Sequence, residues 1–328
     1  MHQPKPIPMK NTLFMAIIMA FLYSCGGAPK EYNVVVEVIP DDVQKFIYSA
    51  SFKPTNWAIY DVCRKFMDAL ESGDLAAVES TFADSVSLYL ADGSVFDSTK
   101  DSIMVIAAGY MDMAQNLNIT HHAGMSMRST DMKHDWALAW ITESYTTPEG
   151  VEEQIAFQEN YLIESGKIRT IRQYALTLPA GVVIEDSPDS EFTYSGSFEK
   201  ADESLREPVL GWNNAISTPT DFDEAAQYLA DSVTIYLMDG SMFNASKDSI
   251  MSLVNVMLGD FTSIDVQFDA ITTVHSKDQN QDWVLSWTNE TMVNAAGEEE
   301  NVLVHEDYLI EDGKIRMVRQ FGMKTSPE

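Results

Sequence analysis

A long internal repeat is the feature that most constrains the fold of this chain. Residues 84–174 align with residues 231–321 at a constant offset of 147 without a gap, and 36 of the 91 aligned positions are identical. The motifs Asp92-Gly93-Ser94 and Gly166-Lys167-Ile168-Arg169 return unchanged. A unit of roughly 130 residues is long enough to bury its own core, whereas solenoid repeats have roughly 20 to 50 residues. The sequence therefore predicts two copies of one self-sufficient domain.

The ends of the repeat and the composition between the copies predict the domain boundaries. A shorter echo, Phe46–Phe52 against Phe192–Phe198, places the start of each copy before its first helix. A stretch containing Pro, Gly and acidic residues separates the copies, as is typical of a linker. The predicted parts are a signal segment, a tether, the first domain, a linker and the second domain, at residues 1–24, 25–45, 46–177, 178–191 and 192–328.

Each copy shows helical patterns before strand patterns. Apolar residues at helical spacing predict a helix over residues 57–70 that ends at Gly73, and Asp74 is expected to cap a short helix over residues 75–82. A strand, a third helix and four long strands are expected to follow, at residues 86–90, 100–114, 119–129, 135–145, 153–164 and 167–176. Helices followed by an antiparallel meander predict an α+β domain whose sheet curls over the helices.

The turn between the last two strands predicts how these strands pair. Ser165-Gly166 stands there in the first copy and Asp312-Gly313 in the second, and Asp-Gly favours the two-residue type I′ hairpin turn. The pairs expected from such a turn are Glu159 with Arg172, Tyr161 with Thr170, and Ile163 with Ile168.

Two segments carry a resemblance to a known family. SGDLAAVESTFADSVSLYLADGS (72–94) and YLIESGKIRTIRQY (161–174), together with the order of elements, resemble the SnoaL-like branch of the nuclear transport factor 2-like superfamily. The resemblance implies two tandem cone-shaped domains, each with N-terminal helices packed on a curved antiparallel sheet. Because this superfold hosts many unrelated functions, the resemblance indicates fold and not activity.

The catalytic residues of the enzymes that the chain resembles are mostly missing. Ketosteroid isomerases use an aspartate base, a tyrosine and a protonated acid inside the cone. Alignment puts these three positions on Leu90 and Leu237, on Phe66 and Asn213, and on Glu159 and Glu306, respectively. A leucine cannot accept a proton. SnoaL-like cyclases carry an acid just after the aromatic residue of the last strand, where residues 175–177 and 322–324 offer none. The resemblance therefore argues against an enzyme.

A ligand site is nevertheless expected inside each cone. Strand alternation places Glu159 and Tyr161 on one face with Arg172 and Tyr174 beside them. An apolar concavity with a few converging polar groups is the usual ligand site, and Arg is suited to hold a carboxylate. An ordinary cross-strand ion pair is the alternative role of the Glu and Arg side chains. The predicted binding residues are Glu159, Tyr161, Arg172 and Tyr174, with Glu306, Tyr308, Arg319 and Phe321 in the second copy.

The other candidate residues point to structural roles. His121 and His122 face opposite ways on a strand, and the histidines show no metal-ligand spacing, so no metal site and no cofactor are expected. Cys63 has no obvious activator and is expected to be an inert buried thiol. Four tryptophans at period two are expected in the core: Trp136, Trp140, Trp283 and Trp287.

The N-terminal segment predicts export. Lys5 and Lys10 precede an apolar run over residues 13–23, which is shorter than the roughly 20 residues that span a bilayer. Small residues then surround Cys25. This pattern resembles a lipoprotein signal peptide and implies that Cys25 carries a lipid. The expected location is the cell envelope, with the protein anchored to the outer membrane on its periplasmic or surface face.

The charge of the chain limits its partners. The formal net charge is −29 at pH 7, and a surface of this sign repels phosphates. Nucleic acid is therefore not an expected partner, and membrane contact is expected only through the lipid anchor.

These observations predict an exported, lipid-anchored protein that binds a small apolar or carboxylate-bearing ligand in one or both cones without catalysis. Two alternatives stay open. In the first, the domains form an interaction scaffold, paired within the chain or as a homodimer. In the second, the protein is an isomerase-like or cyclase-like enzyme that uses Glu159 or Glu306, which requires a raised carboxyl pKa instead of an ion pair.

Overall fold

The computed structural model describes residues 52–130, 132–178, 198–217 and 222–325. Both copies of the repeat lie in one compact unit, residues 47–328. The expected signal segment with Cys25, the tether and the linker apart from Leu178 fall outside the described residues. Within the described ranges, no helix has both the length and the apolar character needed to cross a membrane.

The first repeat follows the predicted order of helices and strands. Its elements are β1 (Phe52–Pro54), α2 (Ala58–Ser72), α3 (Leu75–Thr81), β2 (Phe82–Tyr89), β3 (Val95–Thr99), α4 (Lys100–Met113), β4 (Gln115–Ser129), β5 (Asp135–Thr146), β6 (Glu152–Glu164) and β7 (Lys167–Thr177). The sequence did not predict β1 or β3. β1 pairs with the end of β4, and β3 pairs with β2, so both lie at the margins of the sheet.

The second repeat has the same order, with one weaker helix. Its elements are β8 (Phe198–Lys200), η1 (Glu203–Leu205), α5 (Arg206–Ile216), η2 (Asp223–Tyr228), β9 (Leu229–Tyr236), β10 (Met242–Ser246), α6 (Lys247–Leu258), β11 (Phe261–Ser276), β12 (Gln281–Asn294), β13 (Glu299–Glu311) and β14 (Lys314–Lys324). The 3-10 segment η2 stands where the first repeat has the α-helix α3.

The caps of the first two helices explain where each begins and ends. Gly73 follows α2 with a φ of 72°, and the amides of Gly73 and Asp74 donate to the carbonyls of Leu70 and Ala69 at 3.1 and 3.0 Å. This is the glycine-dependent ending of a helix. Asp74 then caps α3, because its carboxylate accepts from the amide of Ala77 at 3.0 Å.

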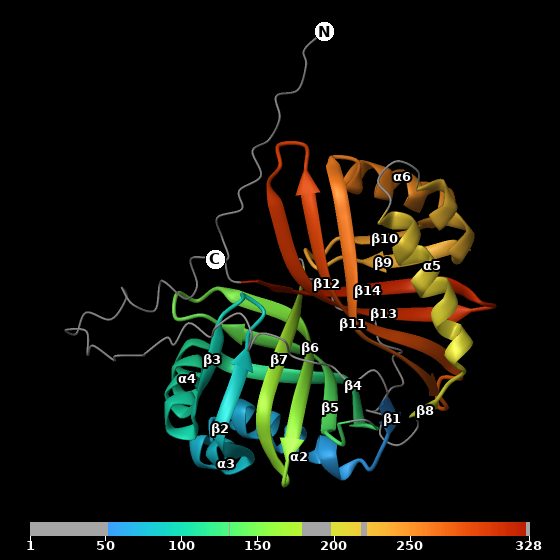
Figure 1. Ribbon diagram of the computed structural model, residues 1–328. Helices are drawn as coiled ribbons and strands as arrows, with labels where there is room; N and C mark the ends of the chain where they lie inside the picture. The colour runs from blue at the N-terminus through green and yellow to red at the C-terminus, as the bar shows by residue number, and fades with distance from the viewer. Residues whose placement is uncertain (1–51, 131, 179–197, 218–221, 326–328) are drawn as a thin grey trace. The chain divides into compact units, whose positions relative to one another are not determined.

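Each repeat folds one curved sheet over its helices. In the first repeat the strand order is β3-β2-β7-β6-β5-β4-β1, and all neighbours are antiparallel except β2 and β7. The helices and the inward side chains of β5, β6 and β7 share one core that includes Phe66, Val78, Ile141, Tyr161 and Ile171. Figure 1 shows α5 and α6 against the strands of the second repeat in the same way. The predicted α+β cone is confirmed.

The two sheets meet at β7 and β14 with a pseudo-two-fold relation. Ala175 pairs with Gly322, which is its own equivalent at the offset of 147. The amide of Thr177 donates to the carbonyl of Met238, and the equivalent amide of Lys324 donates to that of Ala91, both at 3.0 Å. Equivalent groups therefore make equivalent bonds, and the two repeats pair within the chain as the scaffold alternative expected.

The predicted register of the last hairpin is wrong beyond its first pairs. The turn has the expected positive φ angles, 51° at Ser165 and 73° at Gly166, and Ile163 pairs with Ile168 as predicted. Beyond this pair the register shifts by one, because Arg169 is an extra residue in a β-bulge. The pairs are then Leu162 with Thr170, Tyr161 with Ile171, Asn160 with Arg172, and Glu159 with Gln173. The second repeat has the same shift between Leu309 and Ile310.

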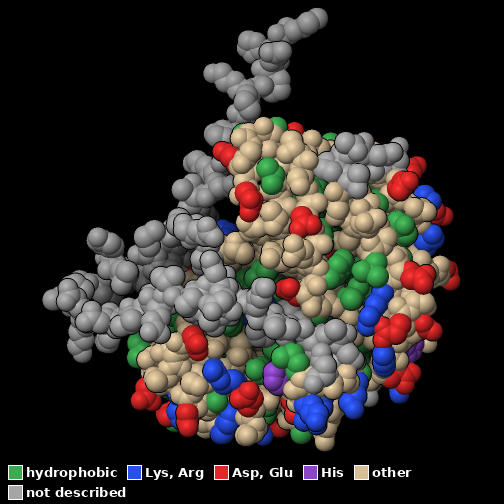
Figure 2. Space-filling view, viewed as in Figure 1, with side chains coloured by type: hydrophobic (Ala, Val, Ile, Leu, Met, Phe, Trp, Pro, Cys, Tyr) green, Lys and Arg blue, Asp and Glu red, His purple; other side chains and the backbone are tan. Residues whose placement is uncertain are grey.

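The outer surface mixes both signs of charge. Figure 2 shows acidic and basic side chains interspersed on the visible face, without a continuous acidic block. Surface ion pairs such as Lys247 with Asp231, at 2.9 Å, account for part of this mixture. Pairs of this kind contribute little to stability because water screens them.

Candidate functional site

The inside of the first cone holds a hydrogen-bonded glutamate. Glu159 on β6 is 5% exposed and points to the helical side of the sheet together with Tyr161. The Tyr161 hydroxyl donates to Glu159 Oε2, and Gln173 Nε2 donates to Glu159 Oε1 at 2.9 Å. The structure thus brings together two of the predicted binding residues, Glu159 and Tyr161, and adds Gln173.

A second buried acid in the same cone was not predicted. Glu143 on β5 is 5% exposed, and the hydroxyl of Tyr110 on α4 donates to its Oε2. Burial, and then the charge of Glu159, raise the pKa of Glu143 to about 8. Burial also raises the pKa of Glu159, against the bonds from Tyr161 and Gln173 that lower it. Two carboxyl groups therefore share one water-poor interior, where each disfavours ionisation of the other.

The second cone repeats this pair of acids. Glu306 accepts from the hydroxyl of Tyr308 and, at 3.3 Å, from Gln320 Nε2. The Thr288 hydroxyl donates to Glu290 Oε1 at 3.1 Å. Burial, and then the charge of Glu290, raise the pKa of Glu306 to about 8. Burial also raises the pKa of Glu290.

The walls of the two cones differ although the acids are the same. Tyr110, which bonds Glu143 in the first cone, is replaced at the offset of 147 by Met257, which is 42% exposed. Glu290 is only partly buried, whereas its equivalent Glu143 is buried. Asn213 Nδ2 donates to the Tyr308 hydroxyl at 3.1 Å, at the position where the first cone has an apolar phenylalanine. The second cone is therefore the more open and the more polar of the two.

The positions that the sequence resemblance assigns to a catalytic base are apolar here. Leu90 and Leu237 are partly buried and pack against the cores of their repeats. Cys63 is fully buried, and burial raises the pKa of its thiol well above the ordinary value, which fits the prediction of an inert cysteine. His121 lies 3.4 Å from the Tyr60 hydroxyl, whereas His122 lies 2.6 Å from the Thr142 hydroxyl.

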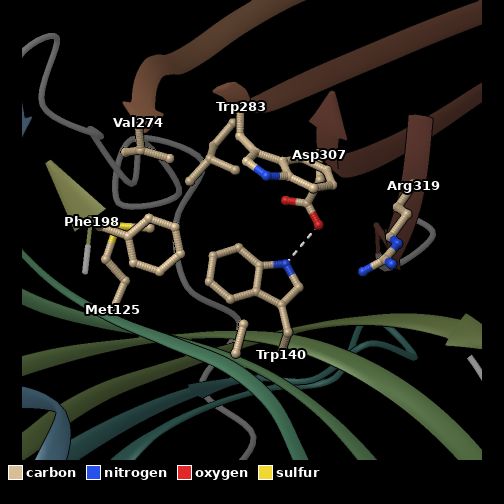
Figure 3. Close-up of a pocket in the computed structure, with 9 residues that line it drawn as sticks. Met125, Trp140, Phe198, Val274, Trp283, Asp307 and Arg319 are labelled. Atoms are coloured by element: carbon tan, nitrogen blue, oxygen red, sulfur yellow. Dashed lines mark hydrogen bonds between the residues drawn. The ribbon is translucent and has the colours of Figure 1, made fainter. Parts of the chain in front are cut away.

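The four remaining predicted binding residues do not lie in the cones. The bulge turns Arg172 and Tyr174 to the sheet face opposite the helices, and it does the same to Arg319 and Phe321 in the second repeat. The predicted pair of Glu159 and Arg172 therefore does not form. Arg172 lies over the Tyr89 ring at 4.9 Å, and Arg319 lines a cavity between the two sheets (Figure 3).

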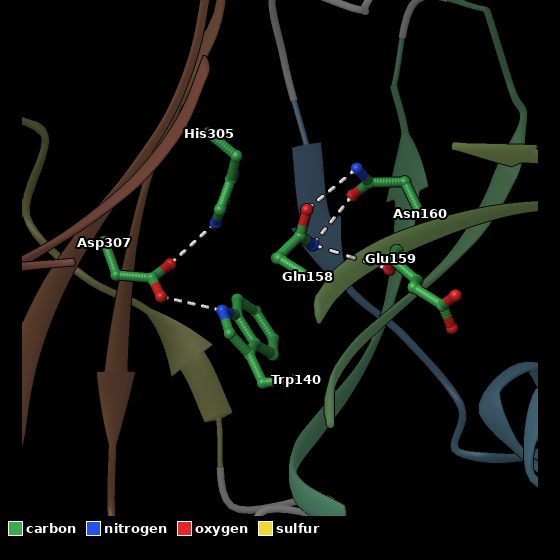
Figure 4. A network of polar contacts seen from close by, with 6 residues as sticks. All are labelled: Trp140, Gln158, Glu159, Asn160, His305 and Asp307. Atoms are coloured by element: carbon green, nitrogen blue, oxygen red, sulfur yellow. Dashed lines mark hydrogen bonds and ion pairs between the residues drawn. The ribbon is translucent and has the colours of Figure 1, made fainter. Parts of the chain in front are cut away.

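A buried polar network lies on these opposing sheet faces (Figure 4). His305 Nε2 bonds Asp307 Oδ1 at 2.7 Å, and Trp140 Nε1 from the first repeat donates to Asp307 Oδ2 at 2.7 Å. At the equivalent positions of the first repeat, the side chains of Gln158 and Asn160 bond each other at 3.0 and 3.1 Å. The network is thus an ionisable pair in one repeat and a neutral amide pair in the other.

The predicted core tryptophans belong to this inter-repeat face. Trp136, Trp140 and Trp287 are 3 to 7% exposed, whereas Trp283 is partly exposed. The rings of Trp140 and Trp287 lie 6.0 and 4.7 Å from the His305 ring. The tryptophans are therefore buried largely by the pairing of the two sheets.

The acids and histidines do not gather at a metal-binding geometry. In the ranges that the structure describes, no three or more His, Cys, Asp or Glu side chains are placed to hold a metal ion. The titratable groups of the cones are instead carboxyl and phenol groups, which suit hydrogen bonding to a ligand.

Comparisons with known proteins identify solved structures similar to a single repeat. No family model matches the chain, and no curated protein matches it. A nuclear transport factor 2-like protein of unknown function from Cytophaga hutchinsonii is 17% identical, with 36% of this chain and 99% of that chain covered and a TM-score of 0.28. An LEH-like epoxide hydrolase from M. tuberculosis is 18% identical, with 36% of this chain and 82% of that chain covered and a TM-score of 0.31.

A third similar structure carries a bound small molecule. This protein from Catenulispora acidiphila has a ketosteroid isomerase-like fold and was solved with trimethylamine. It is 13% identical, with 35% of this chain and 84% of that chain covered and a TM-score of 0.30. Two of these three proteins are described by their fold, as nuclear transport factor 2-like and as ketosteroid isomerase-like.

Proposed function

We propose that the cones bind a small, largely apolar and uncharged ligand that carries a hydrogen-bond acceptor such as a carbonyl oxygen. The carrying observation is the pair of acids inside each cone, of which Glu306 in the second cone is buried. With a pKa of about 8, Glu306 is mostly protonated at pH 7. A neutral carboxyl group donates one hydrogen bond as well as accepting others.

The hydrogen bonds around Glu306 leave its proton available to a ligand. Both of its oxygens already accept, from Tyr308 and Gln320. The Tyr308 oxygen in turn accepts from Asn213. In this proposal an acceptor oxygen of the ligand takes the hydrogen bond from the carboxyl proton of neutral Glu306.

The same geometry argues against a carboxylate-bearing ligand inside the cone. The arginines that were expected to hold a carboxylate lie on the other face of the sheet. An anion between Glu290 and Glu306 would lose its hydration in a water-poor interior beside two acids, neither of which supplies an opposite charge. The ligand of the cone is therefore uncharged in this proposal.

The second cone is the better candidate of the two. In the first cone the Tyr110 hydroxyl donates a hydrogen bond to Glu143, whereas the equivalent residue of the second cone, Met257, is exposed to solvent. Val256, beside Met257 on α6, is 77% exposed, so this helix of the second cone carries uncovered apolar surface. An apolar ligand body would cover such surface on binding.

Native mass spectrometry tests this proposal. The protein is purified from its own host without the signal segment, as wild type, Glu306→Gln and the matched first-cone variant Glu159→Gln. A small-molecule adduct that is present in wild type and Glu159→Gln and absent from Glu306→Gln is the expected result. An adduct that persists in Glu306→Gln, or a wild type without any adduct, contradicts binding at this acid.

Acid–base catalysis is the second candidate function, because the raised pKa of Glu306 is the property that a catalytic acid needs. The apolar Leu90 and Leu237 at the family's base positions weigh against it. A reaction would therefore require Glu290 or Glu143 as the base. Turnover of a bound ligand that stops in Glu290→Gln, with binding retained, would favour catalysis over binding alone.

The location is also part of the proposal, and it rests on the sequence around Cys25. Incorporation of labelled fatty acid into the wild type, and its loss in Cys25→Ser together with release from the membrane, are the expected results. Membrane retention of Cys25→Ser contradicts a lipid anchor. Protease treatment of intact cells then distinguishes the surface face from the periplasmic face.

A further inference from the structure

The pseudo-two-fold is broken around the two inter-repeat arginines. The positive charge of Arg172 acts on Asp269 of the second repeat, whose carboxyl pKa it lowers against the larger effect of burial. At the offset of 147, the equivalent of Asp269 is His122. The equivalent of the acid that acts on Arg172 is therefore a histidine, and the acid beside Arg319 is instead Asp307 on the neighbouring strand.

Arg319 has no anionic partner. It makes no ion pair and donates no hydrogen bond to any residue in the described ranges, and its Nε is buried without a partner. The guanidinium carbon of Arg319 lies over the Tyr236 ring, 5.7 Å from its centroid. Asp307 lies opposite Arg319 on the neighbouring strand, but its two oxygens are turned to His305 and Trp140.

The cavity beside Arg319 is otherwise mostly apolar and aromatic. Its walls are Ala123, Met125, Trp140, Phe198, Val274, Trp283 and Leu285, with Asp307 and Arg319 as the charged groups. Figure 3 shows the Arg319 guanidinium directed into the cavity alongside the Trp140 indole. Because Trp283 and Phe198 are each partly exposed, solvent reaches this region.

The region of the first repeat that corresponds to this cavity is covered by buried aromatic side chains. Trp136 is equivalent to Trp283 at the offset of 147, and Phe52 matches Phe198 at the offset of 146. Trp136 is 4% exposed and Phe52 is 8% exposed. The side with the unpaired arginine is therefore also the open side.

We propose that this inter-repeat cavity binds a small monocarboxylate with an apolar or aromatic body. The carboxylate pairs with the Arg319 guanidinium, which presents the planar donor fork that suits a carboxylate. The apolar body packs against Trp140, Trp283 and Met125. This site is independent of the cones and takes a ligand of opposite character to theirs.

Isothermal titration with benzoate tests the proposal on the mature chain, with neutral benzamide as the matched probe. Wild type is expected to bind benzoate saturably and benzamide at least tenfold more weakly. Arg319→Gln is expected to weaken benzoate binding at least tenfold, whereas Arg172→Gln, at the two-fold equivalent position, leaves it within about twofold. Ala123→Phe, which fills the cavity from the other repeat, is expected to abolish binding.

Several results would overturn the proposal. These are no saturable benzoate binding up to millimolar concentration, equal affinities for benzoate and benzamide, or equal losses in Arg319→Gln and Arg172→Gln. Each variant is checked for an unchanged unfolding temperature, and Arg319→Lys, which keeps the charge, is expected to recover part of the affinity lost in Arg319→Gln. Glu306→Gln is expected to leave benzoate binding unchanged, so this test stands apart from the one for the cone.

Discussion

Replacing Glu306 by glutamine is expected to stabilise the protein at neutral and alkaline pH. Burial and the charge of Glu290 raise the pKa of Glu306 from the ordinary 4.5 to about 8. Between these values the folded state binds a proton that the unfolded state has released, so the free energy of unfolding falls as pH rises from about 4.5 to 8. Below 4.5 both states are protonated and the penalty is absent.

The size of the effect follows from the same pKa difference. Each pKa unit corresponds to about 1.4 kcal/mol, and pH 7 lies about 2.5 pH units above 4.5, so the uptake of this proton on folding costs the wild type about 3 kcal/mol at pH 7. Glutamine stays neutral and keeps one of the two accepting oxygens, whereas its amide nitrogen replaces the other and can donate to the Tyr308 hydroxyl or to the Gln320 side-chain oxygen. Glu306→Gln is therefore expected to raise the free energy of unfolding by up to about 3 kcal/mol at pH 7 and to flatten its pH dependence.

Urea unfolding at a series of pH values between 4 and 9 measures this effect. Glu300→Gln, an exposed acid on the same strand, is the matched control and is expected to change stability little. A Glu306→Gln protein that is less stable than wild type at every pH, or whose difference from wild type does not grow with pH, would refute the reasoning.

Three further substitutions test the contacts between and within the repeats. His305→Gln is expected to lower the free energy of unfolding by about 1 to 3 kcal/mol, because it replaces the ionisable ring beside the buried Asp307 carboxylate with a neutral amide. Adding Asp307→Asn should restore most of this loss by recreating the amide pair of the first repeat, and a double variant no better than the single one contradicts this. Trp140→Phe removes the 2.7 Å bond to Asp307 and is expected to lower the free energy of unfolding by about 2 kcal/mol, where a change near zero would show the bond to be dispensable. Gly124→Ala would place a Cβ 2.2 Å from the Tyr60 ring, so a loss of about 1 to 3 kcal/mol is expected in thermal unfolding, and an unchanged melting temperature would argue against this packing.

The repeat and the local patterns predict most of the fold. Gly73 and Asp74 mark the end of α2 and the start of α3, and the periodicity of β4 to β7 gives four long strands. These signals are local, so the sequence carries them without reference to the rest of the chain. The short strands β1 and β3 pair only at the sheet margins and have too few residues for a clear pattern.

The β-bulge at Arg169 and its equivalent in the second repeat explain why half of the predicted binding residues lie outside the cones. A type I′ turn fixes the first pairs of a hairpin, but one extra residue moves every later side chain to the other face. Glu159 therefore stays in the cone while Arg172 leaves it. Nothing in the turn sequence distinguishes a bulged partner strand from a regular one.

The second acid of each cone had a signal in the sequence. Glu143 returns as Glu290 at the offset of 147, and on strand β5 it alternates with Ile141 and Tyr145, which face the core. An acid that is identical in both copies and shares a face with core residues indicates a functional position. The coupling of Glu143 to Glu159, by contrast, depends on the curvature of the sheet and is not visible in the sequence.

The central claim is that Glu306 is a neutral acid in the second cone at pH 7. Infrared difference spectroscopy between wild type and Glu306→Gln, with side-chain carboxyl groups labelled with ¹³C, measures this directly. The account predicts a protonated-carboxyl stretch at pH 7 that is absent from the variant and fades in the wild type as pH rises through about 8. A carboxylate band at pH 7 in place of that stretch would contradict the account.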